Sequence, residues 1–185
     1  MMSNDHDLLF ELCGEYTDLR LADIQLLAHI AKKLPYYSRS RDADVFINCL
    51  CKNGEEAIVV AEAIRADSLY EFSTVGYIIQ QENEPAVLRS LRYGIETEEV
   101  RATTYASSEN CTVVQSVFPI KRMSRVIGVI IYEHEYADYQ NYSQQLARPY
   151  PTYQVPSISS PAYLMNLEWI GSCIEDGLII IDHIG

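Results

Sequence analysis

The sequence predicts an α+β domain, in which helices cover an antiparallel sheet. Segments with the 3.6-residue period of helices alternate, in no regular order, with short apolar segments typical of strands. The strongest strand segments come in two pairs, each joined by a short polar turn, which favours hairpins over parallel β-α-β units. These two observations predict helices packed on the faces of an antiparallel sheet.

The composition is that of a folded domain, and it argues against some classes of partner. The chain has 185 residues, 48% of them hydrophobic and 22% charged, which suggests one domain with an appendage. Its 14 basic and 26 acidic residues give a net charge of −12, which argues against binding to nucleic acid or to an anionic membrane. The sequence has no membrane-spanning segment, no basic secretory signal and no disulfide spacing among its five cysteines, so we expect a cytoplasmic location.

Leucines at helical spacing predict a helix near 8–16 and a second helix over 21–31. Thr17 or Asp18 is placed to cap the second helix, and Pro35 follows its end. Such a pair of helices could pack on the domain or form a dimer contact.

The first predicted hairpin has strands over 44–50 and 57–64 around the turn Asn53-Gly54. The second has strands over 113–120 and 126–132 around a polar turn. We expect that turn to be a solvated tip carrying Lys121, Arg122 and Arg125.

A short helix is predicted over 84–94, between the two hairpins. Glu84 and Pro85 suit its first turn, and Gly94 stands just past its end. The segment 68–81 has no clear period.

We expect three regions in the chain: a folded domain over 1–137, a Tyr/Pro-rich linker or loop over 138–163, and the start of a further domain over 164–185. Four of the seven prolines fall between residues 149 and 161, where no core-forming period is present. The apolar strand predicted near 178–181 has no partner after it, which predicts that the chain is a piece of a longer protein.

The sequence carries no catalytic motif: we find no nucleophile elbow, zinc-protease helix, phosphate-binding glycine loop or C-x-x-C pair. We therefore expect no catalytic residue, no metal ligand and no cofactor. His134 stands between Glu133 and Glu135 at a strand end, which predicts a solvated edge. Cys49 and Cys51 are more simply packed thiols than a zinc site.

Four polar residues within apolar segments are the candidate ligand-binding residues. Glu62 and Gln115 interrupt predicted strands, and Arg89 and Arg92 share one face of the short helix. An acid and an amide beside an arginine could orient a small polar ligand in a mostly apolar pocket. Alternatively, each faces solvent on the outer side of a half-exposed sheet.

Several blocks of the sequence resemble the N-terminal sensor domain of a family of bacterial cytoplasmic histidine kinases. They are ADVFINC (43–49), AIVVAEA (57–63), ENEPAVLR (82–89), QSVFPI (115–120) and VIGVI (126–130). Ethanolamine-responsive kinases that signal to RNA-binding antiterminator response regulators are among its members. The resemblance covers roughly 15–137 and implies a GAF-like fold with a ligand cavity against the sheet.

The residues over 167–182 resemble the opening helix and first strand of a PAS domain. The phosphoacceptor helix and the ATP-binding motifs of a kinase core do not occur in this chain, so we expect this piece not to be an enzyme. The resemblance implies a sensory input domain that binds a small ligand and modulates a kinase core outside the chain.

The resemblance also implies partners. An ethanolamine-like amine would be the ligand, with Glu62 as the natural counter-ion of its ammonium group. A homodimer and a cognate response regulator would follow from the kinase role. Two alternatives stay open: a dimerisation scaffold whose cavity is filled by its own side chains, and a small enzyme on a GAF-like fold with Cys49 and Cys51 as its reactive thiols.

Overall fold

The computed structural model describes residues 3–104 and 111–136. The predicted linker over 138–163 and the region resembling a PAS domain over 164–185 lie outside these residues. The helices are α1 (Ser3–Tyr16), α2 (Leu21–Ala31), α3 (Leu34–Arg41) and α4 (Pro85–Tyr93). The strands are β1 (Asp44–Leu50), β2 (Glu56–Ala63), β3 (Ile78–Gln80), β4 (Thr97–Thr104), β5 (Cys111–Arg122) and β6 (Arg125–Glu135).

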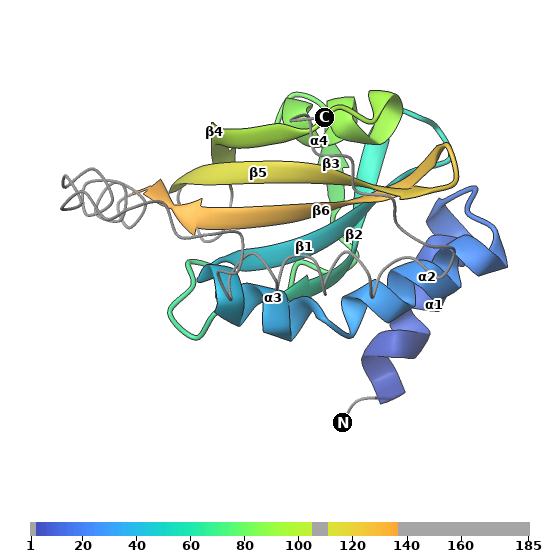
Figure 1. Cartoon of the computed structure of the whole chain (residues 1–185), viewed down its shortest axis with the longest axis horizontal. Helices are drawn as coiled ribbons and strands as arrows, with labels where there is room; N and C mark the ends of the chain where they lie inside the picture. The colour runs from blue at the N-terminus through green and yellow to red at the C-terminus, as the bar shows by residue number, and fades with distance from the viewer. Residues whose placement is uncertain (1–2, 105–110, 137–185) are drawn as a thin grey trace, which may run out of the picture. The chain divides into compact units, whose positions relative to one another are not determined.

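The strands form one antiparallel sheet in the order β3-β2-β1-β6-β5-β4 (Figure 1). The predicted α+β class is confirmed, and so are both hairpins. Asn53 makes the first turn because its side-chain oxygen accepts hydrogen bonds from the N–H groups of Glu55 and Glu56, while Gly54 takes a φ of +72°. β1 and β6, distant in sequence, then pair at the centre of the sheet.

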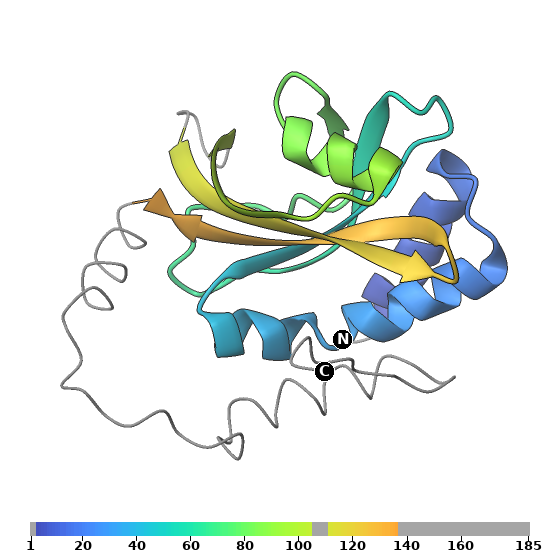
Figure 2. The ribbon, with the colours of Figure 1, turned by 45° about the horizontal axis from the view of Figure 1, so that its top comes forward.

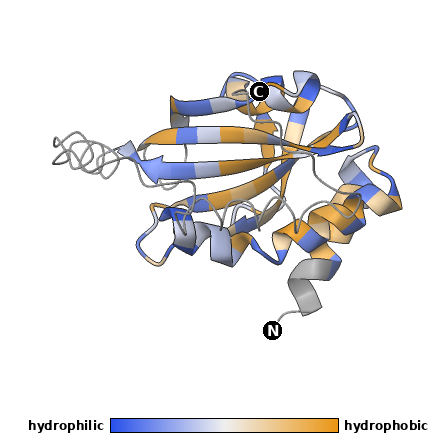
Figure 3. Ribbon diagram, in the orientation of Figure 1, coloured by the Kyte–Doolittle hydropathy of each residue, from blue (hydrophilic) through white to orange (hydrophobic). Residues whose placement is uncertain are grey.

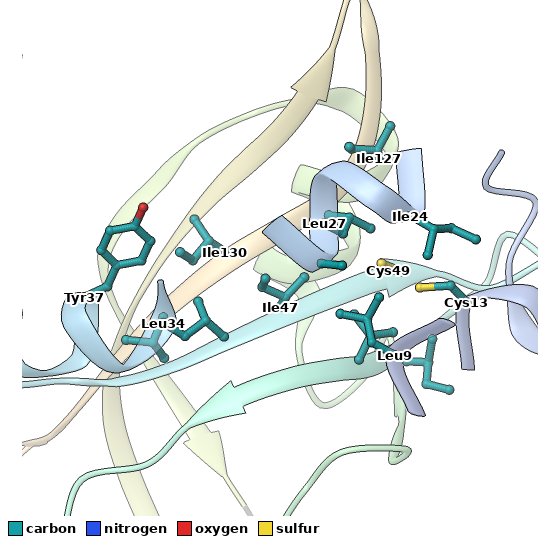
Figure 4. Close-up of a cluster of buried hydrophobic side chains, with 14 of the residues drawn as sticks. Leu9, Cys13, Ile24, Leu27, Leu34, Tyr37, Ile47, Cys49, Ile127 and Ile130 are labelled. Carbon is teal, nitrogen blue, oxygen red and sulfur yellow. The ribbon is translucent and has the colours of Figure 1, made fainter. Parts of the chain in front are cut away.

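Helices α1, α2 and α3 cover one face of the sheet, and α4 covers the other (Figure 2). Hydrophobic residues gather along the middle of the central strands, as Figure 3 shows. On the face of α1 to α3, the side chains of Leu9, Leu27 and Ile47 are fully buried together (Figure 4). On the face of α4, Val87, Leu88 and Leu91 pack against the sheet residues Phe46, Val117, Val129 and Ile131.

Helix α2 begins differently from the sequence prediction. Its N-cap is Arg20, whose backbone N–H donates to Oδ2 of Asp23 at 2.9 Å, so the expected cap by Thr17 or Asp18 is wrong. The hydroxyl of Thr17 instead donates to the carbonyl of Cys13 at 2.6 Å and closes the end of α1. The second helix predicted from the sequence is otherwise correct in extent.

The tip of the β5–β6 hairpin is not simply solvated, contrary to expectation. Arg125 forms an ion pair with Asp23, and Arg122 lies 3.5 Å from the same carboxylate. The side chain of Asp23 is only 1% exposed. Burial alone would raise the pKa of Asp23, but the hydrogen bond from Arg20 and the two arginine charges outweigh it and lower that pKa. This contact fixes α2 to the hairpin.

Two strands were missed by the sequence patterns. β3 lies in the ambiguous segment 68–81, and β4 forms one edge of the sheet. β4 has the sequence TEEVRATT, in which polar side chains dominate because most of the strand is partly or fully exposed. Its register shifts between Thr97 and Val100, where Glu99 takes a φ of +52°.

Candidate ligand-binding site

A row of three buried polar side chains crosses the α4 face of the sheet. Asp44 on β1 lies opposite Glu133 on β6, and Glu133 lies opposite Gln115 on β5. Directly opposite residues project from the same face of a sheet, so these three side chains are neighbours. Gln115 is 1% exposed, Glu133 is 3% exposed and Asp44 is 5% exposed.

Glu133 is the centre of a hydrogen-bond network. Nε2 of Gln115 donates to Oε1 of Glu133 at 2.8 Å and also lies 3.2 Å from Oε2 of Glu84. The hydroxyl of Tyr70 donates to Oε2 of Glu133 at 2.7 Å and is 2.7 Å from Oγ1 of Thr104. Two carboxylates therefore share one amide donor.

Local structure places Glu84 and Tyr70, the two residues that approach this row on the α4 face of the sheet. Glu84 is the N-cap residue of α4, directly before Pro85, so the helix start holds its carboxylate over the sheet. The ring of Tyr70 packs edge-on against Phe46, with ring centroids 5.1 Å apart. The segment that carries Tyr70 is itself held at Asp44, which accepts hydrogen bonds from the N–H of Arg65 at 2.7 Å and from the hydroxyl of Ser68 at 2.5 Å.

The environment disfavours negative charge on both glutamates. Burial, together with the charge of Glu133, raises the pKa of Glu84 to about 8. Burial also raises the pKa of Glu133, although the hydrogen bonds from Tyr70 and Gln115 oppose the shift. Burial and the charge of Glu133 raise the pKa of Tyr70, so its hydroxyl remains a donor. The environment therefore favours a proton on this pair over two negative charges.

Two cavities meet at Glu84. The larger, of about 660 Å³, lies between the start of α4 and strands β4 and β5, and both Arg89 and Gln115 line it. The smaller, of about 130 Å³, lies under Tyr70 against the sheet face that carries Asn48 and Glu133. Three residues line both: Asn83, Glu84 and Thr103.

The structure brings together two of the four residues predicted to bind a ligand. Gln115 and Arg89 both line the larger cavity, where Nη2 of Arg89 donates to Oγ1 of Thr97 at 2.6 Å. Glu62 lies elsewhere on β2, and its Oε2 accepts hydrogen bonds from the N–H and the hydroxyl of Thr74 at 2.9 and 2.7 Å.

The fourth, Arg92, is held away from the cavities. Its Nε donates to the carbonyl of Gly54 at 2.9 Å and its Nη1 to Gln81 at 2.7 Å. The first hydrogen bond joins α4 to the β1–β2 turn, and the second joins it to the residue that follows β3. Ligand binding by any of the four stays a prediction.

Sequence reasoning missed Glu84, Glu133 and Asn48 as candidate site residues. The predicted solvated edge around Glu133 is wrong, because Tyr70 and Gln115 contact its carboxylate and Glu133 is only 3% exposed. A period-2 count along β1 could have placed Asn48 on the face that carries Asp44 and Phe46. No sequence signal places Glu84 beside Glu133, because that contact depends on the packing of α4.

The face of the sheet that α1 to α3 cover holds Cys13, Cys49 and Cys51. Cys13 and Cys49 are fully buried with their sulfur atoms facing each other (Figure 4), and Cys51 is nearly buried. The hydrogen bond with Cys13 and burial raise the pKa of Cys49, which disfavours its thiolate. Such thiols are poor nucleophiles, which gives no support to the enzymatic alternative.

Comparison with known proteins identifies the fold family. A family model described as the GAF domain of the histidine kinase PdtaS matches residues 9–148. The chain belongs to this GAF domain family. The family membership and the six-stranded sheet with its helices confirm the expected GAF-like fold and agree with a sensory role in histidine kinase signalling.

Solved structures similar to this GAF domain share little sequence with it. One is the sensor region of a sensor histidine kinase, with 16% identity, a TM-score of 0.53, and coverage of 83% of this chain and 57% of that one. Another is the phycocyanobilin-bound GAF domain of a cyanobacterial phytochrome, with 14% identity, a TM-score of 0.45, and coverage of 94% and 92%. A sequence comparison with curated proteins found no match. The chain spans just over half of the length of the histidine kinase sensor region. At 16% identity, this similarity concerns the fold alone.

The helices that the structure describes include none of the length and hydropathy needed to cross a membrane.

Proposed function

We propose that this GAF domain is the sensory input domain of a two-component histidine kinase and that it binds a small polar molecule in the cavities beside Glu84. The carrying observation is the network that joins the half-buried Glu84 to the buried Gln115 and Glu133 at the walls of the two cavities. Buried polar groups of this kind stabilise a fold poorly unless they are fully satisfied, and they are typical of sites that orient a ligand. The family match to a histidine kinase GAF domain supports the sensory role.

A small amine of the ethanolamine type is the proposed ligand class. The two cavities are rich in carboxylate and amide oxygens, which accept hydrogen bonds from ammonium groups. Glu62, the counter-ion expected from the sequence, already accepts two hydrogen bonds from Thr74. Glu84 and Glu133 are therefore better placed to be the counter-ions.

Modulation of a kinase core is the other half of the proposal. A ligand shifts the balance between two states of a sensor only by its differential affinity for them. We propose that a PAS domain begins within 164–185, that the signal passes through it to the kinase core, and that a cognate response regulator receives the phosphoryl group. We further propose that the protein acts as a homodimer in the cytoplasm.

The first test is a thermal-shift screen of this chain against small amines, neutral polyols and small carboxylates. A ligand present at about 100 times its Kd stabilises the folded state by roughly 2.7 kcal/mol, which raises Tm by several degrees. Binding by at least one compound, lost when Gln115 is replaced by Met, is the expected result. A screen without any stabilising compound, together with a stable dimer in light scattering, would instead favour the dimerisation scaffold.

A further inference from the structure

Strand β4 forms one edge of the sheet. It is the last strand in the order β3-β2-β1-β6-β5-β4, and among the described residues it pairs with β5 alone (Figure 1). β4 has 8 residues, whereas β3, the strand at the opposite edge, has only 3. The outer side of an edge strand presents backbone N–H and C=O groups with which another strand can pair.

The charged side chains of β4 have no oppositely charged partner within the domain. Glu98, Glu99 and Arg101 are exposed, and none of the ion pairs that the described residues form includes them. Arg101 is held by Tyr136, whose hydroxyl accepts a hydrogen bond from Nη2 and whose ring centroid lies 4.4 Å from Cζ of Arg101. Since a guanidinium group has five N–H donors, this contact leaves donors for a carboxylate.

A bulge in β4 brings its two glutamates to the face that carries Arg101. Between Thr97 and Val100, β4 has one residue more than the paired stretch of β5. Glu98 and Glu99 therefore take one position along the strand, opposite a single residue of β5. This position and Arg101 lie on either side of Val100, and side chains alternate between the faces of a sheet, so both belong to the same face.

Two copies of β4 can pair around a two-fold axis, and the charges favour one register. With the axis at Glu99 or at Arg101, like charges would stand directly opposite each other, which destabilises a strand pair. An axis at Ala102 gives neither sign of charge a partner. With the axis at Val100, Arg101 of each copy stands opposite the glutamates of the other copy, and opposite charges in this position stabilise a sheet.

A bulge and charged side chains on an edge strand can also prevent pairing with other chains. Charges of one sign are enough for that purpose, because they repel the same charges of a second copy. β4 instead carries both signs, placed on either side of Val100, which permits one register and disfavours its neighbours. The apolar side chains of α1 and α2, such as Leu9 and Leu27, are buried against the domain's own sheet, so they are not available to a second copy.

We infer that two copies of this chain pair through β4, antiparallel and with Val100 at the two-fold axis, so that their sheets join into one. The inference rests on the homodimer of the proposed function and assigns its contact surface to β4. Four consecutive residues of β4, 100–103, line the larger cavity, so the contact forms beside the proposed ligand site.

The first measurement is the mass of the chain in solution, by light scattering and sedimentation from micromolar to millimolar concentration. The mass should rise from 21.1 kDa towards twice that value. A salt concentration of about 0.15 M suits the experiment, because its Debye length of about 8 Å screens the net charges of the two copies more than the directly opposed pairs.

Charge reversal tests the register. Glu98→Lys/Glu99→Lys and Arg101→Glu should each weaken the dimer about tenfold, because two attractive charge pairs become two repulsive ones. An equimolar mixture of the two variants should form a dimer at least as stable as that of the parent chain, since every pair is again attractive. Glu11→Lys/Glu15→Lys makes the same change of net charge at exposed positions of α1 and should not weaken the dimer. Circular dichroism confirms that each variant is folded.

A cross-link tests the position of the axis. Directly opposite residues of an antiparallel pair have Cα atoms about 4.5–5.5 Å apart, which suits a disulfide. Val100→Cys should therefore form a disulfide-linked dimer when oxidised glutathione accepts the two electrons. Thr103→Cys on the same strand is the control, because two such residues would lie about 20 Å apart. The parent chain, treated in parallel, gives the background of its own cysteines, and the cross-link needs neither charge variant.

The outcomes separate the contact surface from the homodimer and from the sensory role. A dimer that both charge variants leave unchanged, or that Glu11→Lys/Glu15→Lys alone weakens, overturns pairing through β4 while the homodimer remains. Cross-linking of Thr103→Cys equal to that of Val100→Cys does the same. A chain that stays monomeric at every concentration overturns both the surface and the homodimer, whereas ligand binding in the thermal-shift screen is unaffected.

Discussion

Gln115 and Glu133 are hydrogen-bonded across β5 and β6, with Nε2 of Gln115 2.8 Å from Oε1 of Glu133 and both side chains almost fully buried. A primary amide has two N–H groups, and here the same nitrogen also reaches Glu84. The amide of Gln115 thus stabilises two neighbouring carboxylates that would otherwise repel each other at the walls of the cavities.

Gln115→Met should destabilise the domain at pH 7 by about 1–3 kcal/mol, because both glutamates lose their shared donor while the volume of the side chain is nearly kept. Urea unfolding followed by circular dichroism measures the change. Thr112→Val on the same strand is the control, since Thr112 is exposed and its replacement should cost less than about 0.5 kcal/mol. Equal stability of Gln115→Met and the parent chain would show that the hydrogen bonds of Gln115 do not stabilise the folded domain.

The stability of the domain should fall as the pH rises from 5 to 8. The pKa of Glu84 is raised from 4.5 to about 8 by folding, so between these values the folded state holds a proton that the unfolded state has released. Unfolding is then favoured by each increase in pH, until the folded state also loses the proton above pH 8. Calorimetry at intervals from pH 5 to pH 9 should show this decline.

Glu84→Gln should make that decline shallower, because glutamine cannot release a proton. Glu82→Gln is the matched control: Glu82 lies two residues earlier and is exposed. The two variants should therefore differ in the pH dependence of Tm more than in Tm at pH 5. Identical slopes in both variants would assign the titration to another group.

Asp23→Asn should destabilise the domain by about 1–2 kcal/mol at neutral pH, through loss of charge at the start of α2 and of the contacts with Arg122 and Arg125. Since folding lowers the pKa of Asp23, this stabilisation is present above its unfolded value of 3.8 and is lost as the pH falls through the folded value. Thermal unfolding of the variant should consequently differ most from the parent above pH 4. Asp18→Asn, an exposed acid near the same helix, should leave Tm almost unchanged.

Arg92→Ala should cost about 0.5–1.5 kcal/mol of stability, because two hydrogen bonds between α4 and its neighbours are lost. It should not change the affinity for any ligand of the two cavities, which Arg92 does not line. Urea unfolding measures the loss of stability. Titration of the variant with a ligand found in the thermal-shift screen measures the affinity. A loss of affinity without a loss of stability would restore Arg92 as a ligand-binding residue.

The sequence by itself determined the elements whose signals are local. The turn at Asn53-Gly54, the central strands and the glycine end of α4 follow from side-chain period, from the hydrogen-bonding of Asn and from the left-handed backbone of Gly94. The edge strand β4 gave no such signal, because an exposed strand needs few apolar residues.

Only the tertiary structure decided which polar residues meet. Asp44 and Glu133 are 89 positions apart in the sequence, since 133 − 44 = 89, and they become neighbours through the pairing of β1 with β6. Glu84 reaches Gln115, the neighbour of Glu133, only because α4 packs on that face, and Asp23 meets Arg125 only because α2 packs on the other. A side chain's burial depends on the segments that cover it, so the same local pattern that suggested a solvated Glu133 also fits the buried centre of a site.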